Sequence, residues 1–283
     1  MLTRRRFIRT TALSAASSLG FAGYGFANAL DLPSLRRSTL ELEDLPPSWD
    51  GLRILQISDV HAGPYMDSER MLRVRDMAAK VPADLIVFTG DQMDRRPSDA
   101  QLFARGFRGL QAPLGVWGIL GNHDHFIDPE RSEWALRAAG IEPLVNRGVV
   151  LERGGDELAV VGIEDLHAVN GRSPDFSVLG RFPTAFRICL CHQPQGWRFA
   201  EAAGAHLTIS GHTHGGQIAL TNRNLNAARF STRYIAGPYR RDNALLYVSR
   251  GVGVGAIPVR VGAPPEIDLL TLRRSTVAQS AAA

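Results

Sequence analysis

Five apolar segments of strand length dominate this sequence, and each of them ends in polar side chains that can bind a metal ion. The segments are short and rich in Ile, Leu and Val, and residues 84–89 form a continuous apolar run, which is typical of strands buried on both faces of a sheet. They cover residues 53–58, 84–89, 115–120, 186–191 and 206–209. Helices are predicted after the first three, over residues 68–80, 98–110 and 129–139. This alternation predicts an α/β fold with its site at the carboxyl ends of the strands.

The rest of the chain is richer in strands and fits within the same unit. Further strands are predicted at residues 149–151, 158–163 and 244–248, and a helix at residues 197–203. Residues 30–50 are polar and contain prolines, and we interpret them as a lead-in segment before one domain over residues 51–283. With 283 residues and 45% hydrophobic content, the chain can bury a sizeable core in a single large domain.

The strand ends carry carboxylate, imidazole and carboxamide groups. Along the chain these are Asp59, His61, Asp91, Asp94, Asn122, His123, Asp124, His192, His212 and His214. Most of the local motifs are weak when taken singly, because a Gly-Asp pair also forms turns and an Asn or Asp also caps helices. The run Gly211–Gly215 is different, since two histidines between glycines suit neither a core nor a tight turn. The shared setting of all five motifs predicts a metal site.

The ligand types favour two transition-metal ions. Hydrolysis of a phosphate ester near neutral pH needs a strong nucleophile and neutralised phosphoryl charge, which two divalent cations about 3.5–4 Å apart supply together. A single Asp at a strand end can bridge such a pair. Mixed His, carboxylate and Asn ligands suit Mn, Fe, Zn or Co better than Mg. A closed structural zinc site has four ligands, and the clustered side chains exceed that number.

The series of motifs over residues 52–217 resembles the calcineurin-like metallophosphoesterase superfamily. The resemblance implies a four-layer αββα sandwich, in which two mixed β-sheets are flanked by helices. It also implies the ligands of two divalent metal ions. These are Asp59, His61 and His214 for the first ion, Asn122, His192 and His212 for the second, and Asp91 as the bridge between them.

The resemblance further implies which residues act in catalysis. His123 would lie over the phosphate and protonate the leaving oxygen or stabilise the transition state, and Asp124 would orient the His123 ring. Asp94 matches a supporting position beside the ligands. A non-catalytic metal-binding scaffold is the alternative, and the presence of both His123 and Asp124 argues against it.

Two departures from the motifs of the phosphoprotein phosphatases narrow the class of phosphate ester that we expect as substrate. The phosphoprotein phosphatase branch has Arg before its Gly-Asn-His motif and Glu after it, whereas this chain has Leu120 and Asp124. Residues 215–217, 249–253 and 264–267 resemble the exported bacterial branch of YaeI- and YkuE-type phosphodiesterases. We therefore expect a phosphodiesterase whose substrate is a small-molecule or lipid-linked phosphodiester of the envelope or another extracytoplasmic site. A UDP-diacylglucosamine-type pyrophosphatase is the alternative, although its substrate is cytoplasmic.

The N-terminus has the layout of an export signal, which we assign to residues 1–29. Arginines at positions 4–6 and 9 precede a charge-free, mildly apolar stretch from residue 10 to residue 30. This order resembles the twin-arginine signal that export machinery reads, and it predicts a periplasmic or extracytoplasmic location. Ala27 and Ala29, on either side of Asn28, offer a small-x-small cleavage site that would start the mature chain at Leu30. An uncleaved form, tethered to the membrane surface, is the alternative.

The charge pattern argues against a nucleic-acid partner. The formal net charge is +4, and the four arginines of the signal account for all of it. The body of the protein is therefore formally neutral. The only cysteines, Cys189 and Cys191, lie two apart on a predicted strand, which is awkward for a disulfide, and we interpret them as packing residues.

Overall fold

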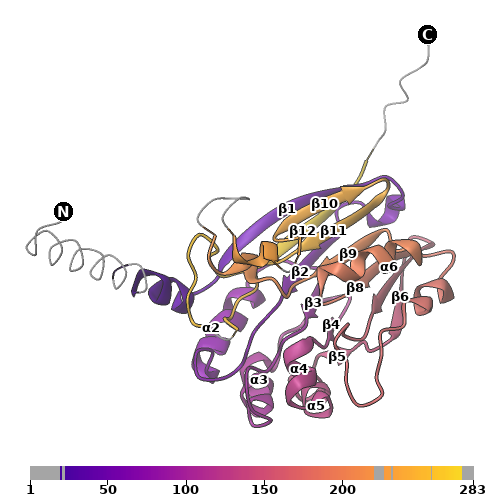
Figure 1. Ribbon diagram of the computed structural model, residues 1–283. Helices are drawn as coiled ribbons and strands as arrows, with labels where there is room; N and C mark the ends of the chain where they lie inside the picture. The colour runs from indigo at the N-terminus through magenta and orange to yellow at the C-terminus, as the bar shows by residue number, and fades with distance from the viewer. Residues whose placement is uncertain (1–19, 21–22, 220–225, 231, 256, 276–283) are drawn as a thin grey trace, which may run out of the picture.

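Two six-stranded β-sheets pack face to face and organise the fold (Figure 1). The computed structural model describes residues 20, 23–219, 226–230, 232–255 and 257–275. The strands are β1 Ser34–Leu42, β2 Arg53–Ile57, β3 Leu85–Thr89, β4 Val116–Ile119, β5 Glu142–Pro143, β6 Arg147–Arg153, β7 Asp156–Gly162, β8 Phe186–Leu190, β9 Leu207–Ser210, β10 Gly237–Arg241, β11 Ala244–Val248 and β12 Glu266–Arg274. The helices are α2 Ser68–Ala79, α3 Asp99–Phe107, α4 Asn122–Ile127, α5 Pro129–Ala139 and α6 Trp197–Ala202. Short 3-10 turns are η1 Pro47–Trp49, η2 Phe176–Arg181, η3 Pro194–Gly196, η4 His214–Gly216 and η5 Ala227–Phe230.

Both sheets are mixed. The first has the strand order β1-β12-β2-β3-β4-β5, in which β2 to β5 run parallel and β12 is antiparallel to β2. The second has the order β10-β11-β9-β8-β7-β6, with parallel strands in the middle and an antiparallel strand at each edge. Parallel neighbours end at the same edge of a sheet. The residues that follow β2, β3 and β4, and those that follow β8 and β9, are therefore brought together.

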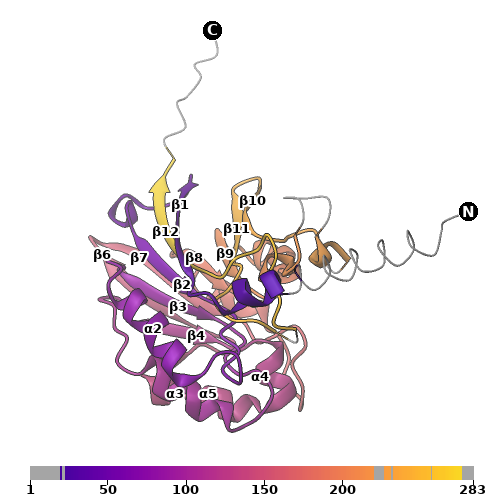
Figure 2. The ribbon, with the colours of Figure 1, turned by 90° about the vertical axis from the view of Figure 1, so that its left-hand side faces the viewer.

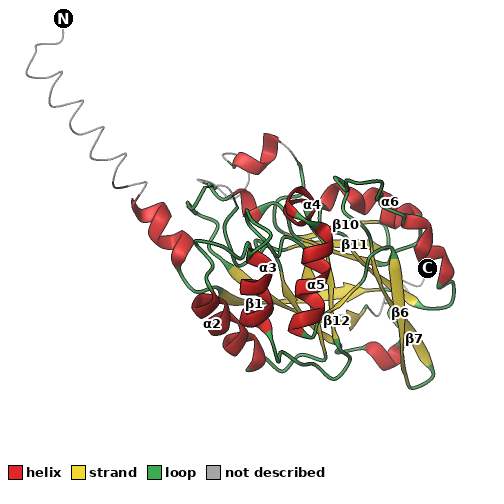
Figure 3. Ribbon diagram, turned by 90° about the horizontal axis from the view of Figure 1, so that it is seen from below, coloured by secondary structure: helices red, strands yellow, loops and turns green. Residues whose placement is uncertain are grey.

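Alternating side chains of each central strand fill two different layers. On β3, Leu85 and Val87 pack between the sheets, while Ile86 and Phe88 face the helices. The Phe88 ring lies edge-on to the Phe103 ring of α3, with ring centroids 5.7 Å apart. Figures 2 and 3 show α2, α3 and α5 side by side over this outer face of the first sheet.

The outer face of the second sheet is covered from the other side. Cys189 of β8 packs with Leu179 of η2 and Ala200 of α6. Both cysteines are free and buried, as interpreted from the sequence. Helices, two sheets and a further helical layer confirm the predicted four-layer αββα sandwich.

Strands β1, β5, β10 and β12 and helix α4 were not predicted from the sequence. The residues 30–50 interpreted as a lead-in contain β1, which pairs in parallel with β12 along nine residues from Ser34 to Leu42. Alternation of exposed and buried residues along β1 is irregular, and its partner lies more than two hundred residues away, so local sequence gives little indication of the pairing. This segment is part of the first sheet in the folded protein.

The predicted signal lies mostly outside the described residues, which omit 1–19 and 21–22. Residues 23–30 are helical and lie against the body of the protein (Figures 1 and 2). The Arg260 backbone N–H donates to the Gly25 carbonyl at 2.9 Å, and the buried Arg70 guanidinium donates to the Ala29 carbonyl at 2.9 Å. Within the described part of the chain, no helix has both the length and the hydrophobicity to cross a membrane.

Candidate metal centre

The seven predicted ligands meet where the strands of both sheets end. Asp59 and His61 follow β2, Asp91 follows β3 and Asn122 begins α4 after β4, all from the first sheet. The second sheet contributes His192 after β8, and His212 and His214 after β9. Ligand atoms of Asp59, His61 and His214 all lie within 4.8 Å of one another, and so do those of Asp91, His192 and His212. Six of the seven predicted ligands therefore form two adjoining clusters.

Five of these seven residues have a left-handed backbone. Their φ angles are 53° for Asp59, 49° for His61, 56° for Asp91, 73° for His212 and 51° for His214. Few residues other than glycine adopt this region, and each such residue costs on the order of 1 kcal/mol or more. The sharp turns direct successive side chains into one small volume. Backbone strain is thus concentrated at the predicted ligands.

Glycines in the motifs leave room for the ligand carboxylates. A Cβ added at Gly121 would lie 2.3 Å from Asp91 Oδ1, and one added at Gly211 would lie 2.3 Å from Asp59 Oδ2. Such distances are far shorter than any van der Waals contact. The glycine before Asn122 and the glycine before His212 are therefore required by close packing.

The first cluster places three ligand atoms around one point. His61 Nε2 lies 3.1 Å from His214 Nε2, and His214 Nε2 lies 3.5 Å from Asp59 Oδ1. The Asp59 carboxylate is held in place by the Ser58 hydroxyl at 2.5 Å and the His212 backbone N–H at 2.9 Å. Two ring nitrogens that face each other within a buried site fit a shared cation.

Asp91 lies between the two clusters, as a bridging ligand must. Its Oδ2 is 3.5 Å from His61 Nε2 of the first cluster and 3.3 Å from His192 Nε2 of the second. Its Oδ1 accepts from the His123 backbone N–H at 2.9 Å. The His192 and His212 rings stand edge to face with centroids 5.1 Å apart.

Unpartnered polar atoms at the site fit a pair of cations. Asn122 Oδ1 and His192 Nε2 are buried and have no hydrogen-bond partner. His192 Nδ1 donates to the Thr89 carbonyl at 2.7 Å, which turns Nε2 towards Asp91. A buried acceptor without a donor costs about 1–3 kcal/mol, and metal coordination removes that cost. The residues present therefore fit the two ions that the ligand pattern implies.

Three of the four predicted ligand histidines are poised as neutral ligands. Burial lowers the pKa of His61 and of His212 to about 3. Burial, with the positive charges of His61 and Arg260, holds the pKa of His214 well below its usual value. Neutral imidazoles have a lone pair to offer at neutral pH.

The carboxylates and His192 are electrostatically coupled. Burial opposes ionisation of Asp91, but the charge of His192 outweighs it and holds the pKa of Asp91 well below its usual range. Burial likewise opposes the charged form of His192, yet Asp91 and Asp59 raise its pKa well above 6.5. Burial raises the pKa of Asp59 to about 6. Bound cations would take the place of the proton on His192.

His123 lies beside the clusters with its ring fixed. Its Nδ1 is 3.1 Å from the Asp94 backbone carbonyl, which can only accept, so Nδ1 carries the hydrogen and Nε2 is left to exchange a proton. The ring is edge-on to the His61 ring at 4.6 Å. Ligand atoms of His61, Asp91 and His123 also lie within 4.8 Å of one another, so distance alone does not separate His123 from the ligands. The Asp94 side chain meets His61, with Oδ1 3.7 Å from Nδ1.

Asp124 has a different role from the one predicted. It is fully buried, and its carboxylate accepts from the backbone N–H groups of Gly121, Gln92 and Met93 at 2.9–3.2 Å and from the Ser132 hydroxyl at 2.6 Å. The ring of His123 is instead oriented by the Asp94 carbonyl. Asp124 therefore fixes the loop after β3 to helices α4 and α5, and the interpretation that it orients His123 is corrected.

Two residues near the site were missed. Asp165 is buried, accepts from the Gln193 side chain at 2.8 Å and raises the pKa of His192. It follows the predicted strand 158–163, so the strand-end rule could have found it. Arg260 is fully buried, donates to the Gly253 carbonyl and lies 3.1 Å from His214 Nδ1. No local pattern marks Arg260 in the sequence.

A two-sheet sandwich with adjoining His, Asp and Asn clusters at its strand ends defines a metallophosphoesterase. The chain belongs to the calcineurin-like phosphoesterase family, whose sequence profile matches residues 52–216.

Relatives match over almost the whole chain. An uncharacterised metallophosphoesterase of Bacillus subtilis, YkuE, is 31% identical over 283 residues, covering 96% of this chain and 98% of its own length. The phosphodiesterase YaeI of Escherichia coli is 26% identical over 283 residues, covering 96% of this chain and all of its own. A transmembrane protein with a metallophosphoesterase domain from Danio rerio is 30% identical, and this chain spans 63% of its length.

Proposed function

We propose that this protein is a dinuclear-metal phosphodiesterase that cleaves an extracytoplasmic phosphodiester of the cell envelope. The observation that carries the proposal is the position of Asp91 between two clusters of neutral or ionised ligands, with His123 beside both. When bound there, two divalent cations would act as Lewis acids on the phosphoryl oxygens and activate a water nucleophile.

The chain's own residues would handle the leaving group. Since the Asp94 carbonyl fixes the hydrogen on Nδ1 of His123, the Nε2 atom is the one that can deliver a proton to the leaving oxygen. The Phe126 ring lies 6.3 Å from the His123 ring and is 65% exposed. It offers an apolar face to an ester arm of the substrate.

A diester rather than a phosphoprotein monoester is supported by the position before the Gly-Asn-His motif. That residue, Leu120, is 1% exposed and packs into the core with Phe88 and Leu136. Position 120 therefore supplies no guanidinium group to bind the phosphate, which suits the single negative charge of a diester. The name of the related YaeI, a phosphodiesterase, points the same way.

The decisive test is hydrolysis of bis-p-nitrophenyl phosphate by the purified chain with added Mn²⁺, compared with p-nitrophenyl phosphate. We expect turnover of the diester, loss of that turnover in EDTA and recovery when Mn²⁺, Zn²⁺, Fe²⁺ or Co²⁺ is added back. His192→Ala is the comparison variant, because it removes one predicted metal ligand. Metal-loaded protein that cleaves no diester would support the non-catalytic scaffold, and cleavage confined to UDP-diacylglucosamine would support the pyrophosphatase.

We further propose export by the twin-arginine machinery. What supports it is the order of arginines and charge-free residues in positions 1–30. Replacing Arg4 and Arg5 together by Lys should leave the protein in the cytoplasm, whereas Arg36→Lys should not change export. Unchanged export of the Arg4 and Arg5 variant would remove this assignment.

The packing of Ala29 favours the tethered form over the cleaved one. Ala29 is fully buried, and its carbonyl, which belongs to the bond that a peptidase would cut, accepts from Arg70. The same guanidinium donates to the Asp31 carbonyl at 2.7 Å. Proteolysis needs an exposed, unbonded backbone. Mass spectrometry of the exported protein should find residues 1–29 still attached, and a mature chain beginning at Leu30 would refute this.

A further inference from the structure

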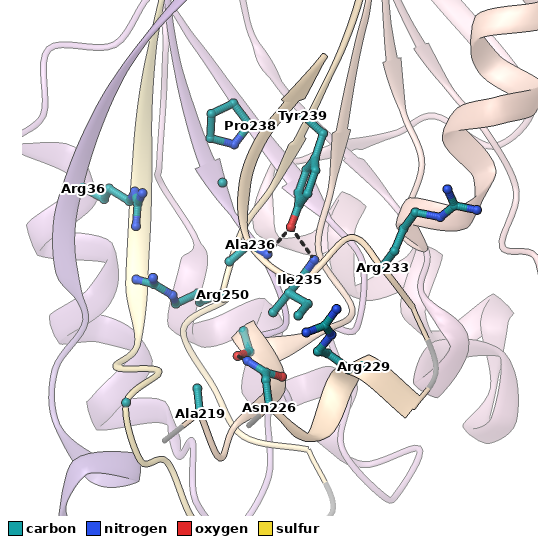
Figure 4. Close-up of a pocket in the computed structure, with 13 residues that line it drawn as sticks. Arg36, Ala219, Asn226, Arg229, Arg233, Ile235, Ala236, Pro238, Tyr239 and Arg250 are labelled. Carbon is teal, nitrogen blue, oxygen red and sulfur yellow. Dashed lines mark hydrogen bonds between the residues drawn. The ribbon is translucent and has the colours of Figure 1, made fainter. Parts of the chain in front are cut away.

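A cavity of about 550 Å³ lies beside the metal centre and is lined by four arginines (Figure 4). The arginines come from separate segments and are Arg36, Arg229, Arg233 and Arg250. Among the described residues that line the cavity there is no Asp or Glu. The cavity therefore concentrates positive charge.

One carboxylate forms ion pairs with two of the four guanidinium groups. Glu266 lies 3.0 Å from Arg250 Nη1 and 3.7 Å from Arg36 Nη1. It also accepts from the Arg250 backbone N–H at 3.0 Å. Because Glu266 is already shared, its charge offsets only one of the two arginines.

A further hydrogen-bond donor faces the same space. The Tyr239 oxygen accepts from the Ile235 backbone N–H at 2.8 Å and from the Ala236 N–H at 3.4 Å, as the dashed lines of Figure 4 show. Its own hydrogen is therefore left for another acceptor. A lining of guanidinium groups and a phenol hydrogen fits an anion with several acceptor oxygens.

The cavity adjoins the metal centre at two points. Gly215, which lines the cavity, directly follows the predicted ligand His214. Arg250 directly precedes Gly251, at which an added Cβ would lie 2.6 Å from the Asp59 Cβ. Two loops therefore contribute residues both to the cavity and to the metal centre.

We propose that this cavity is a second anion subsite, which binds a phosphate or carboxylate group carried by the substrate next to the ester that is cleaved. The proposal rests on the proposed phosphodiesterase function and specifies its substrate class. A substrate with two anionic groups is bound at both positions, whereas a simple diester uses the metals alone. Charge-assisted, bidentate contacts make the second group a strong determinant of affinity.

The test compares two inhibitors of bis-p-nitrophenyl phosphate hydrolysis that differ by one phosphate. These are the thymidine dinucleotide with and without a 5′-phosphate. For the wild-type protein we expect the phosphorylated form to have the lower inhibition constant, by roughly tenfold or more. In the double variant Arg36→Gln and Arg233→Gln this ratio should fall about tenfold. Both inhibition constants are measured on the same variant. A folding defect that weakens the binding of both dinucleotides equally therefore leaves their ratio unchanged.

The control variant is Arg73→Gln, which changes an exposed arginine on α2 and should leave the ratio as it is. A double-variant ratio equal to that of the wild type, or no inhibition by either dinucleotide, would overturn the subsite. Phosphate and carboxylate are distinguished by repeating the comparison with a 5′-carboxylate analogue. If the diester itself is not hydrolysed, the proposed function fails, and calorimetric titration of the metal-loaded protein with the same pair still measures the ratio.

Discussion

His123 and Asp124 are adjacent in the sequence, but they contact different parts of the fold. His123 is partly exposed beside the ligand clusters, whereas Asp124 is fully buried under the loop after β3. Their residue types could be identified from the motif. The partner of each side chain could not, because Asp124 reaches Ser132 and Gln92 through tertiary packing that no local pattern encodes.

Replacing His123 by Ala should lower kcat by about 10²–10⁴, the usual contribution of a general acid. The ion content should stay near two metals per chain, because the seven ligands are untouched. Metal analysis by plasma mass spectrometry and steady-state kinetics check both statements. His192→Ala is the comparison, and it should lose metal. If His123→Ala also lost metal, His123 would have to be reassigned as a metal ligand.

Arg260 is a second residue whose effect can be measured. Its guanidinium donates to the carbonyls of Gly253, Gly251 and Ala263, and its backbone N–H donates to Gly25. Arg260→Lys keeps the charge but loses the planar set of donors. We expect a loss of about 3 kcal/mol in unfolding free energy, which corresponds to roughly 6–12 °C in Tm.

Calorimetry of Arg260→Lys beside the exposed Arg105→Lys measures this effect, and the Arg105 variant should melt with the wild type. Equal melting of both variants would show that the carbonyls around Arg260 are satisfied without it.

At the scale of elements, the central strands and their helices were predictable and the edges were not. β3 is a continuous apolar run, β2 and β4 are mostly apolar, and the predicted bounds of all three agree with the structure to within one residue. β1 and β12 pair across the chain, since Ser34 lies opposite Glu266. Such pairing depends on long-range packing, which periodicity in a single segment does not reveal.

Asp268 of β12 links the two sheets and gives stability a predicted pH dependence. It accepts from Tyr247 Oη of β11 at 2.7 Å and from Ser249 Oγ at 2.6 Å. Burial, together with the negative charge of Glu266, raises the pKa of Asp268 to about 7. Between about pH 4 and pH 7 the folded state keeps a proton that the unfolded chain releases, so this group's contribution to stability falls as pH rises.

Asp268→Asn removes this titration. The stability of the variant relative to wild type should therefore be more favourable at pH 8 than at pH 5, by at least about 1.4 kcal/mol, the equivalent of one pKa unit. Urea unfolding at the two pH values measures the difference. Asp76→Asn, at an exposed position, should show no such change. If the stability of Asp268→Asn relative to wild type were the same at both pH values, the Asp268 carboxyl of the wild type would be ionised throughout this range.

For the whole molecule, the metal centre connects the two sheets. The first sheet supplies Asp59, His61, Asp91 and Asn122, and the second supplies His192, His212 and His214. The sequence could predict that these residues lie together because each of them follows a mostly apolar strand, and parallel strands end at a common edge. It could not identify the arginine-lined cavity, whose four arginines come from positions 36 to 250 and meet only in the folded chain.

Metal removal should therefore lower the stability of the whole protein, and not only its activity. Without cations, two buried carboxylates and the left-handed ligand residues are held without compensation, whereas bound ions would join the two sheets. Free metal at about 100 times Kd stabilises by about 2.7 kcal/mol per site, so two sites should raise Tm by roughly 10 °C or more.

Scanning calorimetry of EDTA-treated protein with and without added Mn²⁺ measures this shift. His192→Ala should show a smaller increase than the wild type, because one site has lost a ligand. A Tm that stays constant while the bound metal is removed would contradict this prediction, because it would require the unfolded chain to bind the ions as tightly as the folded one does.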